Sequence, residues 1–204
     1  ANGPGFDGGS VPYNSEGKID VSGDAMADGY MDMDAGHDIY VKGDVESGSY
    51  MEMDAGYDIK LNQTSKGYTQ SGGYMDIDAG DDVIVHGDAD SGGTMDILAG
   101  DDIRFKKDVE SADDMKMAAA DDIELNKNSS GYTKSGGKMD MEAGTSNPDG
   151  DFMAWGKLET TDAGNGAMTV QAADDVEMYK TPTSADSAGT LTLIADSDSS
   201  GAGD

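Results

Sequence analysis

The chain has 204 residues, 42 acidic against 13 basic side chains, a formal net charge of −29 and no cysteine. Without cysteine, a disulfide scaffold, a thiolate zinc site and a cysteine nucleophile are excluded. Nucleic acids and anionic membrane surfaces attract clustered lysine and arginine, so neither is an expected partner of so acidic a chain. The apolar stretches are too short for a membrane-spanning helix, so membrane insertion is not expected either.

Residues 1–18 form an N-terminal arm without the repeat pattern of the rest of the chain. Its first residue, Ala1, is not a start methionine, which fits a processed, secreted protein. Residues 19–30 then align with the second half of the repeat unit, residues 39–50. We therefore expect a single repeat domain, residues 19–195, that opens on a second strand carrying Ile19 and Val21.

A complete repeat unit begins at Met31 with the phrase Met-Asp-Met-Asp-Ala-Gly, and the phrase restarts seven times at spacings of 20, 24, 20, 20, 24, 29 and 23 residues. Residues 31–74 recur in 95–138 without a gap. Such periodicity predicts an array in which each unit packs on its neighbours. The units start near Met31, Met51, Met75, Met95, Met115, Met139, Met168 and Leu191.

Each unit contains two short runs in which apolar and polar residues alternate. Met31 and Met33 share one face of the first run, and Ile39 and Val41 share one face of the second. A period of two predicts half-buried strands and not helices. Ser-Gly clusters follow the second run, and we expect them to form the loop that closes each unit.

The order strand, bend, strand, loop fits either a meander of hairpins or a stack of β-arches. A tight hairpin turn prefers Gly or Asn at positive φ, yet the bend position of Gly36 is occupied by Ala120 in a later unit. This tolerance favours arches. We therefore predict an all-β fold of stacked β-arch repeats, a two-sheet β-solenoid-like array with a Met-rich core.

The last unit, Leu191–Ala195, matches only the first strand, and an acidic Ser-Gly tail follows at residues 196–204. Unpaired strand edges can pair with another chain. We expect copies of this chain to polymerise edge to edge, with Ile19, Val21, Leu191 and Leu193 on the assembling edges. The alternative is that residues 2–17 or the acidic tail fold over an edge.

Stacking also places carboxylates in rows, because Asp38 recurs as Asp58, Asp82 and Asp102 in successive units. Like charges on adjacent strands destabilise the pairing. Two explanations stay open, a solvated face screened by salt or structural cations such as Ca²⁺. No other cofactor is expected.

In the tail, Asp196, Asp198 and Ser200 occupy the first, third and fifth places of an EF-hand-type loop. The terminal Glu and the flanking helices of that motif are missing, so we interpret the segment as an acidic tail and not as a metal site.

No catalytic motif occurs, and His37 and His86 lie at different places in the repeat, where both are expected to be exposed. We therefore expect no enzymatic activity and no small-molecule substrate, with a polysaccharide hydrolase as the remaining catalytic alternative.

Two further features stand out from the repeat. Asn62 and Asn128 begin glycosylation sequons in the two 24-residue units. In the lengthened unit at residues 144–167, Phe152 and Trp155 form either a docking surface or a larger core.

The phrase that starts at Met31, followed by Asp38-Ile39 and Val41, resembles two families. Over roughly residues 19–195, the arch repeat and the acidic, Met-rich, Cys-free composition are similar to the extracellular sheath proteins of filamentous methanogenic archaea. That resemblance implies β-arch subunits joined edge to edge into amyloid-like rings around the cell. The chain would then be a structural homopolymer of the cell surface or sheath.

The segment Thr94–Ile103 is also similar to the β-solenoid repeats of filamentous-haemagglutinin-type adhesins. This second resemblance implies the alternative of a secreted adhesin or a carbohydrate-binding surface protein. The chain is shorter than those adhesins, richer in Met and without their secretion domain.

Overall fold

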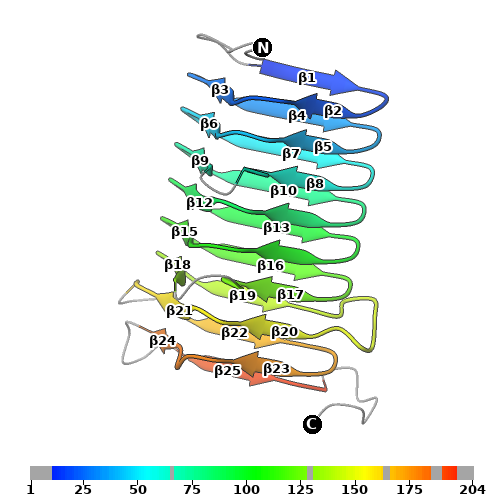
Figure 1. Ribbon diagram of the computed structural model, residues 1–204. Helices are drawn as coiled ribbons and strands as arrows, with labels where there is room; N and C mark the ends of the chain where they lie inside the picture. Colours follow the sequence, from blue (N-terminus) through cyan, green and yellow to red (C-terminus); the bar gives the residue numbers. More distant parts are fainter. Residues whose placement is uncertain (1–10, 65–66, 128–130, 163–165, 185–189, 197–204) are drawn as a thin grey trace.

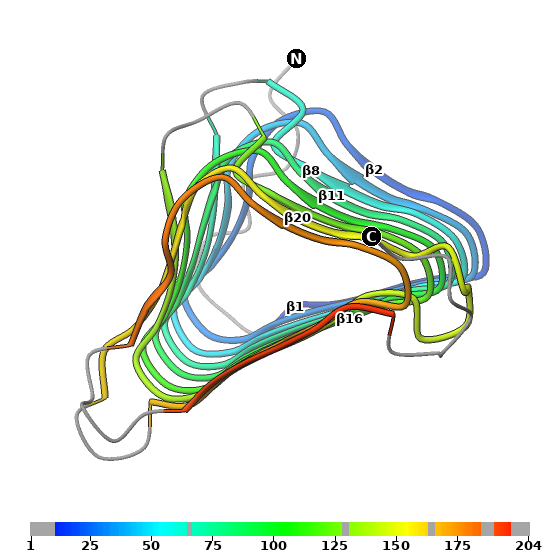
Figure 2. The same ribbon diagram turned by 90° about the horizontal axis from the view of Figure 1, so that it is seen from below.

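Successive turns of the chain stack as parallel strands into a three-sided solenoid (Figures 1 and 2). The computed structural model describes residues 11–64, 67–127, 131–162, 166–184 and 190–196. Within these ranges every regular element is a strand. The described part of the chain contains no helix with the length and apolar character needed to cross a bilayer. The predicted all-β, stacked, β-solenoid form is therefore confirmed.

Each turn contributes one strand to each of three sheets, which we name A, B and C in chain order. Sheet A consists of β1 (Val11–Ser15), β4 (Met31–Ala35), β7 (Met51–Ala55), β10 (Met75–Ala79), β13 (Met95–Ala99), β16 (Met115–Ala119), β19 (Met139–Glu142), β22 (Met168–Gln171) and β25 (Leu191–Ile194). Sheet B consists of β2 (Ile19–Val21), β5 (Ile39–Val41), β8 (Ile59–Leu61), β11 (Val83–Val85), β14 (Ile103–Phe105), β17 (Ile123–Leu125), β20 (Phe152–Ala154) and β23 (Val176–Met178).

Sheet C consists of β3 (Ala25–Ala27), β6 (Val45–Ser47), β9 (Tyr68–Ser71), β12 (Asp88–Ser91), β15 (Val109–Ser111), β18 (Tyr132–Ser135), β21 (Lys157–Thr160) and β24 (Thr183–Ser184). The predicted unit starts from Met31 to Leu191 are all first residues of sheet A strands.

The strands pair in a register that stacks equivalent residues of successive turns. Met31 aligns with Met51, and Ile39 aligns with Ile59. Both predicted runs of each unit turn their apolar residues into a shared interior, where Met31, Met33, Ile39 and Val41 are buried. The core is thus a continuous column of in-register apolar side chains, and burial of this column is the main favourable contribution to folding.

The cross-section differs from the two-sheet expectation, because the segment expected to be a loop forms sheet C. Its inward residues are small or polar, as in Val45-Glu46-Ser47, so the apolar alternation is short and inconspicuous. The Ser71 hydroxyl of this sheet donates to the carbonyl oxygens of Ser49 and Tyr74, at 3.0 and 2.7 Å, whereas the buried Ser47 hydroxyl has no hydrogen-bond partner among the described residues. Backbone carbonyls can therefore satisfy a polar side chain at this corner, as they do for Ser71.

The corner between sheets A and B is an arch and not a hairpin turn, since every strand pair is parallel and each corner joins two different sheets. Glycine recurs there because the corners of neighbouring turns touch. A Cβ atom on Gly56 would lie 2.5 Å from the carbonyl oxygen of Gly36, and one on Gly100 would lie 2.0 Å from that of Gly80. The predicted arch is confirmed, with close packing as the reason for its glycines.

Candidate functional site

Two surfaces of the solenoid are candidates for function, its ends and the outer face of sheet A. The ends matter because the last strand of each sheet has an unpaired edge among the described residues. The outer face of sheet A matters because its carboxylates are concentrated and lack basic partners, as shown below.

At the N-terminal end, Ile19 and Val21 lie on β2, the end strand of sheet B, as their assignment to an edge required. The expectation that the chain opens on half a unit is wrong, however, because β1 precedes β2 and pairs with β4 along its length. Part of the expected arm therefore belongs to the solenoid. The segment Val11–Ser15 was not predicted as a strand because it keeps none of the repeat phrase.

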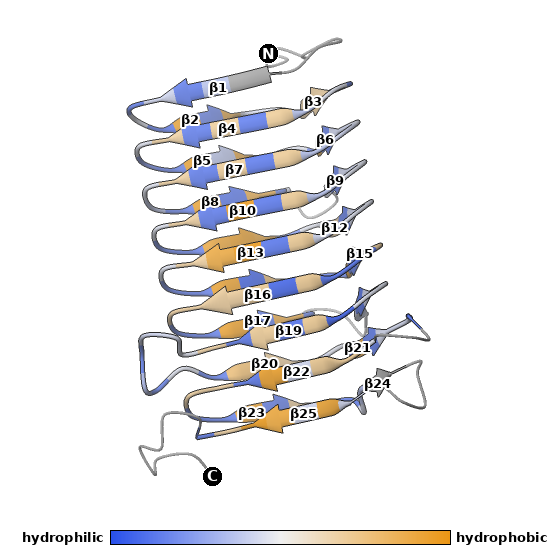
Figure 3. Ribbon diagram, turned by 180° about the vertical axis from the view of Figure 1, so that it is seen from behind, coloured by the Kyte–Doolittle hydropathy of each residue, from blue (hydrophilic) through white to orange (hydrophobic). Residues whose placement is uncertain are grey.

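At the C-terminal end, β25 is the last strand of sheet A and leaves apolar side chains uncovered (Figure 3). Leu191 and Leu193 are aligned with the buried Met168 and Val170, yet they are 45% and 49% exposed. A hollow of about 410 Å³ opens beside Leu193, and Val176, Met178 and Pro182 also line it. This end is therefore an apolar surface on which none of the described residues forms a further strand.

The outer face of sheet A carries two rows of acids on β4, β7, β10 and β13. In one row Asp32, Glu52, Asp76 and Asp96 are in register. Residues in register on adjacent strands are about 4.8 Å apart, so these carboxylates repel one another. We name the seven acids that line a shallow hollow of about 390 Å³ the acidic face: Asp32, Asp34, Glu52, Asp54, Asp76, Asp78 and Asp96.

The electrostatics of the acidic face follow from this crowding. Partial burial, followed by the charges of neighbouring carboxylates, raises the pKa of Asp76 and of Asp78 above the ordinary value for aspartate. None of the ion pairs formed by described residues includes a member of the acidic face. Its polar contacts are neutral ones, such as the amide of Asn14 donating to Asp34 at 2.7 Å.

The corner between sheets A and B holds the row of aspartates that the sequence predicted. From Asp58 onward, the carboxylates of this row accept hydrogen bonds from the backbone N–H of the next aspartate: the N–H of Asp102 donates to Asp82 at 3.3 Å, and that of Asp122 donates to Asp102 at 3.0 Å. Two groups bring carboxylate oxygens within 4.8 Å of one another, Asp82 with Asp101 and Asp102, and Asp102 with Asp121 and Asp122. These groups offer oxygen ligands for a divalent cation, but they also have a structural role without one.

The tail residues proposed for an EF-hand-type loop are only partly described. Asp196 has a positive φ of 50° and donates its backbone N–H to the carbonyl oxygen of Asp174 at 2.9 Å. Asp198 and Ser200 lie outside the described residues.

The structure argues against glycosylation at Asn62. This residue is fully buried, and its side-chain amide donates to the carbonyl oxygens of Gly43 and Tyr68 at 2.9 and 2.8 Å. Its structural counterpart is Asn126, which makes the equivalent contacts to Lys107 and Tyr132. A glycan on the side-chain nitrogen of Asn62 would replace one of these two donated hydrogens and would have to fit at a buried position. Asn128 lies outside the described residues.

The aromatic residues of the lengthened unit divide between inside and outside. Phe152 is buried on β20 in register with Ile123, as a core residue. Trp155 lies at the outer surface, where its ring stacks on Tyr179 at 5.5 Å and the Lys127 ammonium lies 5.5 Å from the ring centre. The larger-core interpretation therefore holds for Phe152 and not for Trp155.

The histidines sit among other side chains at the corners. His37 is exposed and stacks on Tyr57 at 5.2 Å, whereas His86 is half-buried beside Lys106 at 3.1 Å. Burial and the charge of Lys106 lower the pKa of His86.

A row of tyrosines that the sequence only hinted at lies beside the acidic face. Tyr30, Tyr50 and Tyr74 stack with ring centres 5.0 and 4.9 Å apart and nearly parallel planes. The Tyr74 hydroxyl donates to Glu52, and this hydrogen bond raises the pKa of Tyr74 to about 12.

Comparison of the chain with protein-family models, with curated proteins and with solved structures finds no significant match.

Proposed function

We propose that this chain is a non-enzymatic structural protein whose copies assemble end to end, by pairing of their terminal strands, into an extracellular sheath or surface layer. The observation that supports this proposal best is the C-terminal end, where Leu191 and Leu193 present apolar side chains beside an unpaired strand edge. Buried apolar area and backbone hydrogen bonds are the two contributions that drive strand addition.

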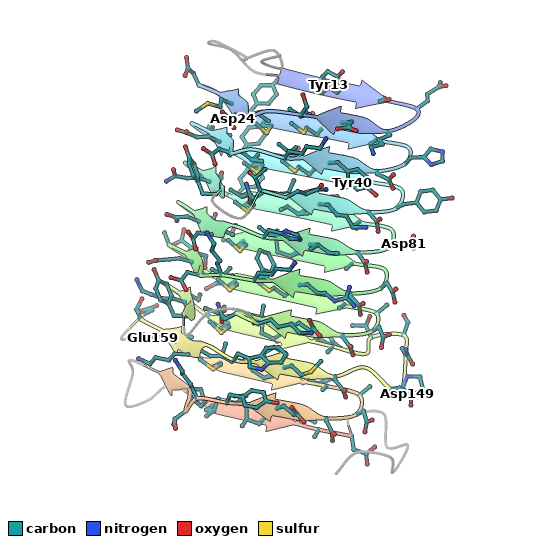
Figure 4. All side chains as sticks on the ribbon, viewed as in Figure 1. Tyr13, Asp24, Tyr40, Asp81, Asp149 and Glu159 are labelled. Atoms are coloured by element: carbon teal, nitrogen blue, oxygen red, sulfur yellow. The ribbon has the colours of Figure 1, made fainter. Side chains whose placement is uncertain are left out.

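The internal construction of the molecule supports the same proposal. Each turn is held by parallel, in-register pairing to the next, so another copy can use the same pairing across a junction. The charged outer faces of the solenoid favour hydration over association, which leaves the ends as the adhesive surfaces (Figure 4). The resemblance to archaeal sheath proteins, drawn from composition and repeat style, suggests the extracellular location.

The test is the state of association of the full chain and of two variants at equal concentration. Leu191→Asp/Leu193→Asp places charges on the apolar end, whereas Thr192→Asn is a control on the same strand whose side chain faces outward and adds no charge to the junction. We expect the wild type and the control to form large species in sedimentation velocity, and the double variant to remain monomeric. A wild type that stays monomeric at high concentration, across salt and Ca²⁺ concentrations, would contradict the proposal.

A second candidate function, a surface adhesin or carbohydrate-binding solenoid, is favoured by the row of Tyr30, Tyr50 and Tyr74. The rings cover one another's faces, however, and expose mainly their edges. Sugars stack on open ring faces, so this row suits carbohydrate less well than a flat aromatic platform would. Retention on glycan-coated surfaces that is lost in Tyr50→Ala/Tyr74→Ala would favour this function over assembly.

A further inference from the structure

The two ends of the solenoid do not continue into each other by simple stacking, because both end on a strand of the same sheet. Among the described residues, sheet A has nine strands and sheets B and C have eight each, because both the first described strand, β1, and the last, β25, belong to sheet A. The chain visits the sheets in the order A, B, C and advances by one strand spacing per turn. If β25 of one copy stacked on β1 of the next, sheets B and C would each lack one strand at the junction.

The outer edge of β1 is a poor base for another strand. The carbonyl oxygen of Ser15 accepts a hydrogen bond from Gly36 at 2.8 Å, so Val11, Tyr13 and Ser15 direct their backbone groups toward β4. The alternate residues, Pro12 and Asn14, direct theirs to the open edge. Proline has no N–H, so that edge has a donor at Asn14 but none at Pro12, and a proline on an edge strand is a common way to hinder strand addition.

β1 also departs from the residue pattern of the repeat on its inner side. Tyr13 takes the position that Met33 and Met53 hold in the next two turns, so a bulky side chain with a polar hydroxyl stands where the repeat has methionine (Figure 4). The same positions of β25 carry the pattern of the repeat, with Leu191 and Leu193 in the places of Met168 and Val170. β25 is therefore the better partner for a sheet A strand.

The open edge of β25 offers both backbone donors and backbone acceptors to another strand. The backbone N–H of Met168 donates to the carbonyl oxygen of Thr190 at 2.9 Å, so Thr190 and Thr192 direct their backbone groups toward β22. Leu191 and Leu193 consequently direct theirs to the open edge, and both have an N–H to donate.

We propose that β1 is a replaceable strand: when two copies join, β25 of one copy displaces β1 of the next and pairs with its β4. This inference rests on the proposed end-to-end assembly and specifies its mechanism. With β1 displaced, β2 lies next to β23, β3 next to β24, and β4 next to β25, so the order of the sheets continues without a missing strand.

The exchange also matches side chains across the junction. By the register of the internal pairs, Leu191 and Leu193 align with Met31 and Met33, and Val176 aligns with Ile19. The hydrogen bonds between β1 and β4 are replaced by those between β25 and β4, whereas the open edges of β23 and β24 gain strand partners that no described strand of the single molecule supplies. The gain in burial comes from the apolar residues of the C-terminal end.

Disulfide mapping distinguishes exchange from simple stacking, since the chain has no cysteine of its own. A copy with Ile194→Cys is mixed with a second copy carrying either Asp34→Cys or Asn14→Cys, in glutathione buffer. Exchange places position 194 beside position 34, and stacking on an intact β1 places it beside position 14. In-register neighbours lie within the Cα separation that a disulfide needs.

We expect the 194–34 disulfide to form in at least about tenfold excess over the 194–14 disulfide, a ratio that corresponds to about 1.4 kcal/mol. A dominant 194–14 disulfide, or assemblies that form neither, would overturn the exchange while leaving end-to-end assembly standing. Absence of both disulfides together with monomeric protein would overturn the proposed function as well.

A locking variant gives an independent readout. Asn14→Cys/Asp34→Cys ties β1 to β4 within one molecule, at a pair that is already hydrogen-bonded. Asp54→Cys/Asp78→Cys is the matched control between two internal strands, β7 and β10. We expect the locked variant to assemble only after reduction and the control to assemble in both redox states. Equal assembly of the oxidised and reduced locked variant would contradict the inference.

Discussion

Acids lie on the outer sides of both sheet A and sheet B, but among the described residues only those of sheet B form ion pairs, since even Lys116, in register with Asp96, pairs with no member of the acidic face. On sheet B, Arg104 lies among three carboxylates of successive turns, those of Asp82, Asp102 and Glu124. Lys60 pairs with Asp58 on the same side of the molecule. On sheet A, the acidic face has no ion pair among the described residues.

This difference shows how an in-register parallel solenoid handles charge. Because the strands are in register, equivalent outward residues of successive turns form a row. A base in one turn can therefore pair with acids of the turns before and after it, as Arg104 does. Where no base is placed, the repulsion remains, and the face stays hydrated and resists association with other faces. The contrast predicts different responses of the two faces to substitution, and opposite responses to pH for Asp76 and Asp78 on the acidic face and for Asp58 beside Lys60.

The largest expected effect is on sheet B, in Arg104→Met. Asp102 is only 6% exposed and would be left without its guanidinium partner, so we expect the free energy of unfolding to fall by about 1–3 kcal/mol. Urea denaturation measures this loss. The matched control is Lys157→Met, which removes the more exposed pair with Glu159 and should change stability by no more than about 0.5 kcal/mol. Equal losses in both variants would contradict the contrast.

The next largest effect on the free energy of unfolding is expected from a change of pH. Asp76 and Asp78 have raised pKa values, so the folded chain binds protons more tightly there than the unfolded chain does. Their contribution to the free energy of unfolding therefore increases as the pH falls from neutral through the raised pKa toward 3.8.

Asp58 behaves in the opposite way. Its burial raises its pKa, but the hydrogen bond and the charge of Lys60 outweigh that effect and lower it. Its contribution is present above the ordinary aspartate pKa and is lost as the pH falls through the lowered value. We therefore expect Tm to rise as the pH falls from 7 toward 3.8 and to fall at more strongly acidic pH, where Asp58 becomes protonated. A Tm that falls steadily from pH 7 downward would show that repulsion on the acidic face is unimportant.

The smallest effect is expected from Asp78→Asn on the acidic face. Removing one charge from a repelling row should raise the free energy of unfolding by about 0.5 kcal/mol at low salt, and the gain should disappear as salt screens the row. Asp20→Asn on sheet B is the control, because Asp20 pairs with Lys18 at 3.5 Å. A gain of the same size in both variants would remove the distinction between the two faces.

The sequence predicted the parts of the fold that depend on strong alternation. Runs such as Met31–Ala35 and Ile39–Val41 became strands of sheets A and B with their apolar residues inside. Sheet C was missed because its inward residues, such as Ser47 and Ser71, are polar, and the backbone carbonyls that accept from the Ser71 hydroxyl become its neighbours only after folding.

The candidate site was predicted unevenly for the same reason. Leu191 and Leu193 could be placed at an edge because they continue the repeat. The strand β1 could not be predicted, because its residues do not match the repeat phrase and because it forms by pairing with β4. The burial of Asn62 was equally hidden, because its hydrogen-bonding partners at Gly43 and Tyr68 come from an adjacent turn and from its own loop.

Electron cryomicroscopy of the protein at high concentration and moderate salt tests the central claim most directly. We expect filaments or rings in which the strand spacing of about 4.8 Å continues through each junction, with a subunit repeat of about 38 Å, eight strand spacings. Single particles under all conditions, or layers joined through the outer faces of the sheets, would contradict end-to-end assembly.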